Sequence, residues 1–193
     1  MFLENNVLNS QQKGRLEIIC GSMFSGKTEE LIKRMRQARL EKCKIVIFKP
    51  CIDNRYHNNK IVSHDQNKEA AISIANANDM LKYVQEIDVV GIDECQFFDE
   101  AILDVLQKMI QKNIRVIVAG LDMDYQSNPF GCMPHLMAIA DDVTKVHAVC
   151  MNCGDAANFS YRKTKSQDQI LVGEKEEYEA LCRFCFKNKM HAK

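Results

Sequence analysis

The segment Gly21–Thr28 constrains this chain more than any other, because it fits the phosphate-binding loop pattern Gly-x-x-x-x-Gly-Lys-Ser/Thr. The glycines of this pattern let the backbone curl, so that successive N–H groups and the start of the next helix cradle a polyphosphate. Lys27 supplies a cation to the β- and γ-phosphates, and the Thr28 hydroxyl can bind Mg²⁺. The loop predicts that a nucleoside triphosphate binds to Gly21, Ser22, Met23, Phe24, Ser25, Gly26, Lys27 and Thr28.

The flanking sequence has the pattern that such a loop requires. An apolar run of strand type, Leu16–Cys20, precedes it, and apolar residues at helical spacing follow it. Strand-like runs at 45–48, 89–92, 116–119 and 143–149 alternate with helix-like segments at 77–84 and 102–110. Nearly continuous apolar strands indicate a parallel sheet covered on both faces. We therefore expect an α/β fold of the phosphate-loop NTPase (RecA-like) type, with helices flanking the sheet and ligands at the carboxyl ends of its strands.

Length and composition allow one full core and a small appended module. The chain has 193 residues, of which 46% are hydrophobic and 27% charged, and its formal net charge is zero. A zero charge argues mildly against a protein built to grip nucleic acid. No apolar stretch reaches the length of a membrane span, and the N-terminus does not resemble a secretory signal. These features predict a cytoplasmic protein with neither membrane nor nucleic-acid partners.

Two adjacent acids follow the strand-like run at 89–92. In nucleotide-binding folds with a phosphate loop, an acid at such a strand end holds Mg²⁺, and Asp93 is the candidate here. Glu94 can face the reacting phosphate and deprotonate an attacking hydroxyl. The alternative is a solvated acidic pair at the end of a strand. A second charged pair, Asp53 and Arg55, could reach the phosphates, although its spacing alone favours an ordinary surface ion pair.

Two cysteine pairs, Cys150-x-x-Cys153 and Cys182-x-x-Cys185, predict a metal site. Each pair can place two thiolates on one ion, and two pairs complete a tetrahedral site without an open position, so Zn²⁺ bound there would be structural. The alternative is a set of reduced cysteines at coincidental spacing. The segment between the pairs would be a loop tied at its base, which lowers the entropic cost of ordering it over a ligand.

The change in composition after residue 149 indicates a domain boundary. The expected organisation is a flexible N-terminal tail (1–14), a phosphate-loop α/β domain (15–149), a zinc-binding lasso or lid (150–187) and a C-terminal tail (188–193).

Three motifs in one order give the chain a family resemblance: the phosphate loop, the run from Ile92 to Phe98 and the double cysteine pair. Together they resemble the type II thymidine kinases, a zinc-containing family. The resemblance covers about residues 15–187. Further matching elements are Asp53-x-Arg55-Tyr56, Gly120-Leu121-Asp122, Tyr125-Gln126 and Pro129-Phe130-Gly131.

This resemblance implies transfer of the γ-phosphoryl group of ATP to the 5′-hydroxyl of thymidine, with Asp93 serving Mg²⁺ and Glu94 acting as the base. Besides the loop, the implied nucleotide-binding residues are Asp53, Arg55, Asp93, Glu94, Cys95 and Gln96. The tied loop would fold over the nucleoside and hold its base largely through main-chain hydrogen bonds. The implied nucleoside-binding residues are Met23, Phe97, Leu121, Tyr125, Phe130, Ser160, Gln169, Ile170, Leu171, Val172, Gly173 and Tyr178.

The resemblance also implies a homotetramer and feedback inhibition by thymidine triphosphate (dTTP). Cys95 stands where the family usually has Ala or Gly, and Tyr125 replaces a Phe of some members; either could adjust the pocket. By pattern alone Phe97 and Phe130 would be core residues. Two other functions stay open at this point: a nucleic-acid-dependent ATPase with a zinc ribbon, and a nucleotide sensor without enzymatic activity.

Overall fold

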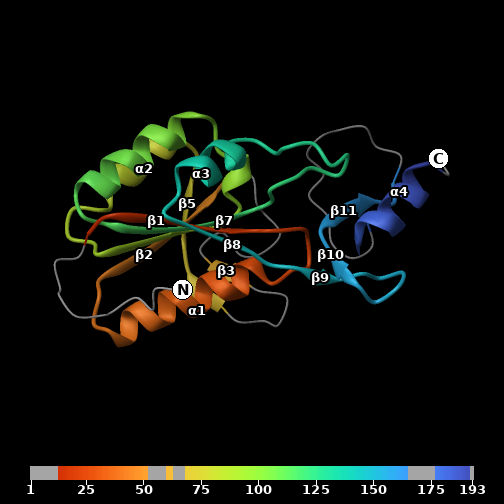
Figure 1. The fold of residues 1–193 in the computed structure, drawn as a ribbon. Coiled ribbons are helices and arrows are strands. Elements are labelled where there is room, and N and C mark those ends of the chain that lie inside the picture. The colour runs from red at the N-terminus through yellow and green to blue at the C-terminus, as the bar shows by residue number, and fades with distance from the viewer. Residues whose placement is uncertain (1–12, 52–59, 63–67, 165–176, 192–193) are drawn as a thin grey trace, which may run out of the picture.

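A parallel six-stranded sheet forms the centre of the protein in the computed structural model, which describes residues 13–51, 60–62, 68–164 and 177–191 (Figure 1). The strand order is β5-β2-β6-β7-β1-β8, and every pairing within this sheet is parallel. Its strands are β1 (Arg15–Cys20), β2 (Ile45–Pro50), β5 (Ile72–Ile74), β6 (Val89–Ile92), β7 (Arg115–Gly120) and β8 (Asp142–Lys145).

Helices cover both faces of the sheet, as its apolar strands require. Helix α1 (Lys27–Leu40) packs on one face, while α2 (Ala101–Gln111), α3 (Met133–Ile139) and the 3₁₀ helix η1 (Ala77–Lys82) pack on the other (Figure 1). Alternation along β1 explains the two cores, because Ile18 faces the α2 side and Ile19 the α1 side. In the described ranges, no helix has the length and apolar character needed to cross a bilayer.

Helix α1 starts directly behind the phosphate loop, and its sequence favours that start. Gly26, with φ of 85°, ends the loop, and Glu29 and Glu30 lie in the first turn, where negative charge stabilises the positive end of the helix dipole. Its buried residues recur at helical spacing and attach the helix to the sheet: Leu31, Ile32, Met35 and Ala38. The helix therefore holds its N-terminal N–H groups at a fixed place beside the carboxyl end of β1.

The C-terminal residues form a small module beside this domain (Figure 1). It consists of the antiparallel pair β9 (Ala148–Val149) and β10 (Ala156–Ala157), the antiparallel pair β11 (Phe159–Arg162) and β12 (Tyr178–Leu181), and helix α4 (Arg183–His191). Phe159 stacks on Phe186 with ring centroids 4.8 Å apart. Phe24 and Met123 of the larger domain pack against this core, so the module is seated on that domain.

Several elements differ from the sequence-based expectations. The single strand expected at 143–149 is divided, because β8 ends at Lys145 in the large sheet and β9 pairs with β10 in the module. The helix expected at 77–84 is the 3₁₀ helix η1, and residues 188–191 of the expected C-terminal tail belong to α4. Helix α3 was not anticipated, nor were β5 and the hairpin of β3 (Lys60–Val62) and β4 (Lys68–Ala70), because short elements carry little periodic signal.

Candidate active site

The phosphate loop connects β1 to α1 and depends on two glycines. Gly21 has φ of 149° and Gly26 has φ of 85°, conformations that L side chains rarely adopt. A Cβ atom at Gly21 would lie 2.2 Å from the carbonyl oxygen of Val146, so the neighbouring backbone excludes a side chain there. The glycines thus let the chain turn at the carboxyl end of β1 and enter α1 with its N–H groups directed at one place.

Lys27 is the first residue of α1, and its side chain turns back over the loop. Its Nζ donates a hydrogen bond of 2.7 Å to the carbonyl oxygen of Ser22, and the residue is only 9% exposed. An ammonium group held against the loop adds its charge to the partial charges of the backbone N–H groups. This combination suits the negative charge of a polyphosphate.

The carboxyl end of β6 brings Asp93 next to the loop. The Thr28 hydroxyl donates to Asp93, with distances of 3.0 Å to Oδ2 and 3.2 Å to Oδ1. Asp93 is 5% exposed, and its Oδ1 also accepts the backbone N–H of Glu94 at 3.0 Å. Hydroxyl and carboxylate oxygens are the hard ligands that Mg²⁺ prefers, so the chemistry of this pair fits a divalent cation beside a bound phosphate.

Glu94 has a constrained backbone and a held side chain. Its φ and ψ are 51° and 41°, the left-handed region in which a non-glycine residue is strained. The Gln96 Nε2 donates to its Oε2 at 2.6 Å, and the Gln96 Oε1 accepts the backbone N–H of Leu121 at 3.0 Å. A carboxylate fixed in this way at the carboxyl edge of the sheet can accept a proton from a hydroxyl placed beside it.

Two of the expected pocket residues form an aromatic corner near this carboxylate. The rings of Phe97, in the 3₁₀ helix η2 (Cys95–Phe97), and Phe130 meet edge to face, with centroids 5.9 Å apart at 87°. Phe130 is 7% exposed and Phe97 is half-buried. Phe130 therefore packs in the core, while the exposed part of Phe97 can form the wall of a pocket.

Strand β11 of the C-terminal module rests directly on the phosphate loop. The Ser160 Oγ accepts the backbone N–H of Met23 at 2.9 Å, and the Ser22 Oγ donates to the carbonyl oxygen of Ala157 at 3.3 Å. Ser160 is 5% exposed. Met23, expected both in the phosphate loop and in the nucleoside pocket, and Ser160, expected in the nucleoside pocket, are thus direct hydrogen-bond partners.

Arg162 contacts both Tyr125 and Tyr178, two expected pocket residues, and the sequence analysis did not identify it. Its guanidinium lies 3.7 Å from the ring centroid of Tyr125, and its Nε and Nη2 donate to the Tyr178 hydroxyl at 3.0 and 2.7 Å. The residue is 2% exposed. A detectable signal existed, because Arg162 follows Ser160 by two residues and strand alternation places both on one face of β11.

Some expected site residues are outside the described part of the structure, and one is buried beneath the site. Asp53, Arg55 and residues 169–173 are outside the described residues. The Cys95 side chain is fully buried, with its Sγ 3.9 Å from that of Cys132. The hydrogen bond with Cys132, together with burial, raises the pKa of the Cys95 thiol well above its usual value. Cys95 therefore belongs to the core beneath the site and does not line the pocket.

Four sulfur atoms cluster at the base of the lid. The Sγ atoms of Cys150, Cys153, Cys182 and Cys185 all lie within 4.8 Å of one another. Tetrahedral Zn–S bonds of about 2.3 Å place sulfurs roughly 3.8 Å apart, so this cluster can bind Zn²⁺. The Asn152 Nδ2 donates to the Cys185 Sγ at 3.1 Å, an outer contact of the kind that orients thiolate ligands.

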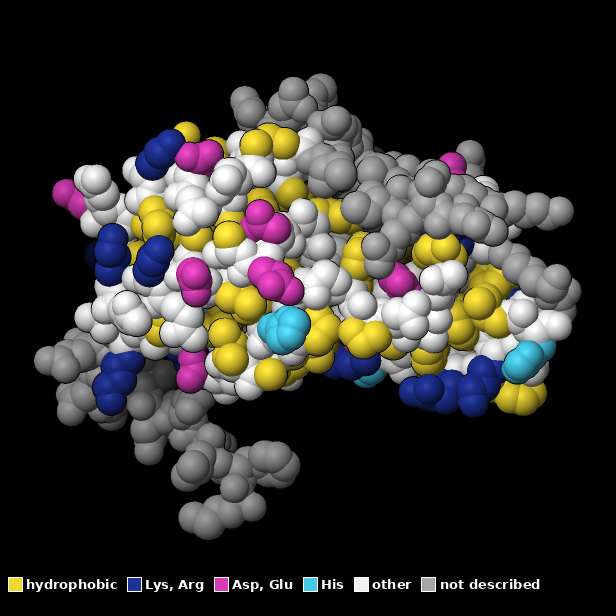
Figure 2. Space-filling view, turned by 90° about the horizontal axis from the view of Figure 1, so that it is seen from above, with side chains coloured by type: hydrophobic (Ala, Val, Ile, Leu, Met, Phe, Trp, Pro, Cys, Tyr) yellow, Lys and Arg dark blue, Asp and Glu magenta, His cyan; other side chains and the backbone are white. Residues whose placement is uncertain are grey.

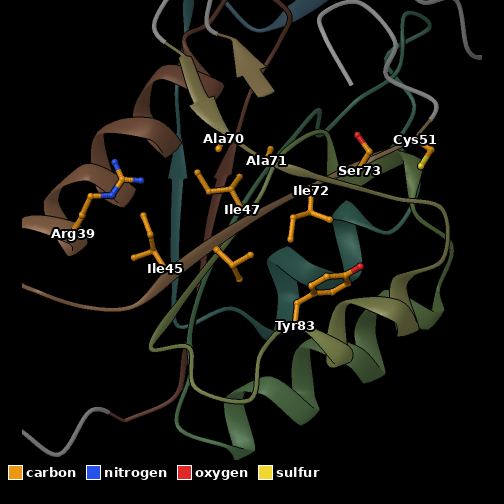
Figure 3. A pocket seen from close by; sticks show the side chains of 10 residues that line it. Arg39, Ile45, Ile47, Cys51, Ala70, Ala71, Ile72, Ser73 and Tyr83 are labelled. Atoms are coloured by element: carbon orange, nitrogen blue, oxygen red, sulfur yellow. The ribbon is translucent and has the colours of Figure 1, made fainter. Parts of the chain in front are cut away.

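A cavity of about 760 Å³ lies away from this site, at the edge of the sheet between β2 and β5 (Figure 3). Aliphatic side chains, among them Ile45, Ile47 and Ile72, line it together with Tyr83. None of its described lining residues belongs to the expected site. The chemistry gathers instead at the carboxyl ends of β1, β6 and β7 and under β11.

Comparison with known proteins agrees with this geometry. A model of one protein family, described as thymidine kinase, matches residues 14–186. The chain belongs to the thymidine kinase family. A thymidine kinase of Bacteroides thetaiotaomicron is 53% identical over 186 residues, covering 96% of this chain and 94% of that protein. One of Porphyromonas gingivalis is 50% identical over 185 residues, covering 96% and 91%.

Among solved structures, AMPPCP-bound DnaA from Aquifex aeolicus matches part of the chain. The match has a TM-score of 0.43 and 11% identity, and it covers 70% of this chain and 42% of that one.

Proposed function

We propose that this chain transfers the γ-phosphoryl group of ATP to the 5′-hydroxyl of thymidine, giving thymidine monophosphate and ADP. The observation that carries the proposal is the meeting of three elements at one loop. The Thr28 hydroxyl lies 3.0 Å from Asp93 at the end of β6, and the Met23 N–H lies 2.9 Å from Ser160 on β11. Membership of the thymidine kinase family supports the choice of acceptor.

On the donor side, the phosphate loop and Lys27 bind the triphosphate of ATP, with Asp53 and Arg55 as further proposed contacts. Thr28 and Asp93 would hold Mg²⁺, which when bound neutralises charge on the transferring group. Phosphoryl transfer requires positioning and charge stabilisation more than covalent catalysis. The rigid connection from β1 through the loop to α1 provides that positioning.

On the acceptor side, Glu94 accepts the proton of the 5′-hydroxyl while that oxygen attacks the γ-phosphorus and the bond to the bridging oxygen of ADP breaks. The proposed walls of the nucleoside pocket are Met23, Phe97, Leu121, Tyr125, Phe130, Ser160 and Tyr178. Residues 169–173 would hold the base through their main chain. A lid fixed by structural Zn²⁺ excludes water, which would otherwise compete as acceptor.

The family resemblance adds three proposals: a cytoplasmic location, a homotetramer and inhibition by dTTP. The contact between Met23 and Ser160 gives the inhibition a physical basis. dTTP carries a thymidine moiety and a triphosphate in one molecule, so it can occupy the lid pocket and the phosphate loop together.

One assay tests the function against the nucleic-acid-dependent ATPase. The protein is incubated with Mg²⁺-ATP and with thymidine, other nucleosides or single-stranded DNA, and nucleoside monophosphate and ADP are measured. We expect thymidine monophosphate, and its loss in Glu94→Gln with nucleotide affinity retained. ATP hydrolysis stimulated by DNA without any thymidine monophosphate would reject the kinase.

The surface over α2 and α3 gives no support to the nucleic-acid-dependent ATPase. Acidic and apolar side chains occupy the middle of this face, whereas a nucleic-acid groove there would need a basic stripe (Figure 2).

A further inference from the structure

Gln96 is a buried side chain whose amide is used at both ends. It is 3% exposed in η2, directly beneath Glu94. Its Nε2 donates to the Glu94 Oε2 at 2.6 Å, and its Oε1 accepts the Leu121 N–H at 3.0 Å. The side chain therefore spans from the end of β6 to the end of β7, with the proposed base on one side and a proposed pocket wall on the other.

The surrounding backbone leaves Gln96 little room to move. A Cβ atom at Gly120 would lie 2.9 Å from the Gln96 Oε1, and one at Gly131 would lie 2.4 Å from the Gln96 carbonyl oxygen. Both glycines thus keep the chain close around this residue, and the Gly131 φ of 53° suits glycine as well. Close packing on two sides fixes the amide in the orientation that meets Glu94.

We propose that Gln96 is a positioning residue, which orients the Glu94 carboxylate for the attacking hydroxyl through its Nε2–H. This inference rests on the proposed function, in which Glu94 is the base. A carboxylate on a flexible side chain samples several orientations, and a hydrogen bond to Oε2 fixes where Oε1 lies. A neutral amide does so without bringing a positive charge, which would make the carboxylate a weaker base.

The same contacts argue that the Gln96 side chain does not bind ATP directly. At 3% exposure, with one N–H directed at Glu94 and its oxygen accepting from Leu121, the amide is held away from solvent. Because Leu121 is also a proposed wall of the nucleoside pocket, Gln96 joins the acceptor pocket to the base. A nucleoside that displaces Leu121 would therefore also displace Glu94.

The test is a double-mutant cycle on the rate constant of the chemical step. This rate constant is measured in single turnover, so that product release does not hide it. Gln96→Met keeps the side-chain length but removes both hydrogen bonds, and Gln96→Glu keeps an acceptor for Leu121 but removes the donor. Each is made in wild type and in Glu94→Gln. In the wild-type background, we expect each Gln96 substitution to lower this rate constant about 100-fold, the loss typical of a catalytic group displaced by about 1 Å. The KM for ATP should stay within about twofold.

In the Glu94→Gln background, the same substitutions should cause no further loss, because the amide then has no base to orient. An equal loss in both backgrounds would assign Gln96 a general structural role and overturn the proposal, as would a rise in the KM for ATP without a fall in kcat. Gln37→Met is the matched control, because Gln37 also donates to a glutamate, Glu41, but on the exposed face of α1. The proposed function itself fails separately, if the wild type forms no thymidine monophosphate.

Discussion

Glu17→Gln should destabilise the fold, because Glu17 is a buried carboxylate surrounded by three arginines. It is 2% exposed in β1. Arg115 donates to it from Nε and Nη2 at 2.6 and 3.1 Å, Arg34 donates from Nη1 at 2.9 Å, and the Arg15 Nε lies 2.9 Å away. Glutamine has nearly the same volume, so the substitution leaves no cavity. It removes the one negative charge that these arginines share.

The structure sets the expected magnitude. Removing one partner of a buried ion pair costs about 3–5 kcal/mol. The arginine side chains are 17% (Arg34), 28% (Arg115) and 43% (Arg15) exposed, so water compensates part of the loss. We therefore expect a loss near the lower bound, about 3 kcal/mol at pH 7. The matched control is Glu69→Gln, which breaks contacts to two exposed arginines and should cost about 0.5–1 kcal/mol.

The loss should also depend on pH. Burial by itself raises the pKa of Glu17, but the hydrogen bond and charge of Arg115, with the charges of Arg15 and Arg34, outweigh burial and lower the pKa below its usual 4.5. The carboxylate thus contributes its full stability above pH 4.5 and loses it as the pH falls through the lower pKa of the folded protein. Urea denaturation of both proteins at pH 7 and below pH 4.5 measures this difference. A loss under about 1 kcal/mol at pH 7, or one that does not shrink in acid, would refute the reasoning.

Two further predictions concern the lid. Removal of Zn²⁺ with a chelator should weaken thymidine binding, while an ATP analogue still binds the phosphate loop. A metallochromic dye should measure the release of one zinc ion per chain. This release should be lost in Cys182→Ser, which removes a proposed ligand, and should persist in the control variant Cys43→Ser. Ser160→Ala removes the acceptor of the part-buried Met23 N–H, a hydrogen bond worth about 0.5–1.5 kcal/mol. Its kcat/KM for thymidine should fall about 2–12-fold, Ser160→Thr should retain most activity, and equal kinetics for both variants would exclude the contact.

Much of the site was predictable because its motifs are local. The phosphate loop is eight consecutive residues, the acids follow one apolar strand, and each cysteine pair spans four positions. The parallel sheet then brings such strand ends to one edge, which accounts for the contact between Thr28 and Asp93 across 65 residues.

The remaining features depend on tertiary contacts that no local pattern encodes. The proposed role of Gln96 requires knowing that the N–H of Leu121, directly after β7, points at it, and the contacts of Arg162 require knowing that the Tyr125 ring lies beside its guanidinium. The division of residues 143–149 follows from pairing, because β8 joins β1 whereas β9 finds β10. For Gln96, for Arg162 and for the pairing of β8 with β1, the partner is distant along the chain, so composition and periodicity carry no record of it.

The hydrogen bond between the Met23 N–H and Ser160 has a thermodynamic consequence. It makes one backbone group common to the triphosphate cradle and the lid, so the two substrates influence a single structural unit. Linkage is reciprocal, and any factor by which ATP changes the affinity for thymidine must equal the factor by which thymidine changes the affinity for ATP. We therefore expect a substitution in β11 that breaks this hydrogen bond to change the affinity for both substrates, even though it never touches a phosphate.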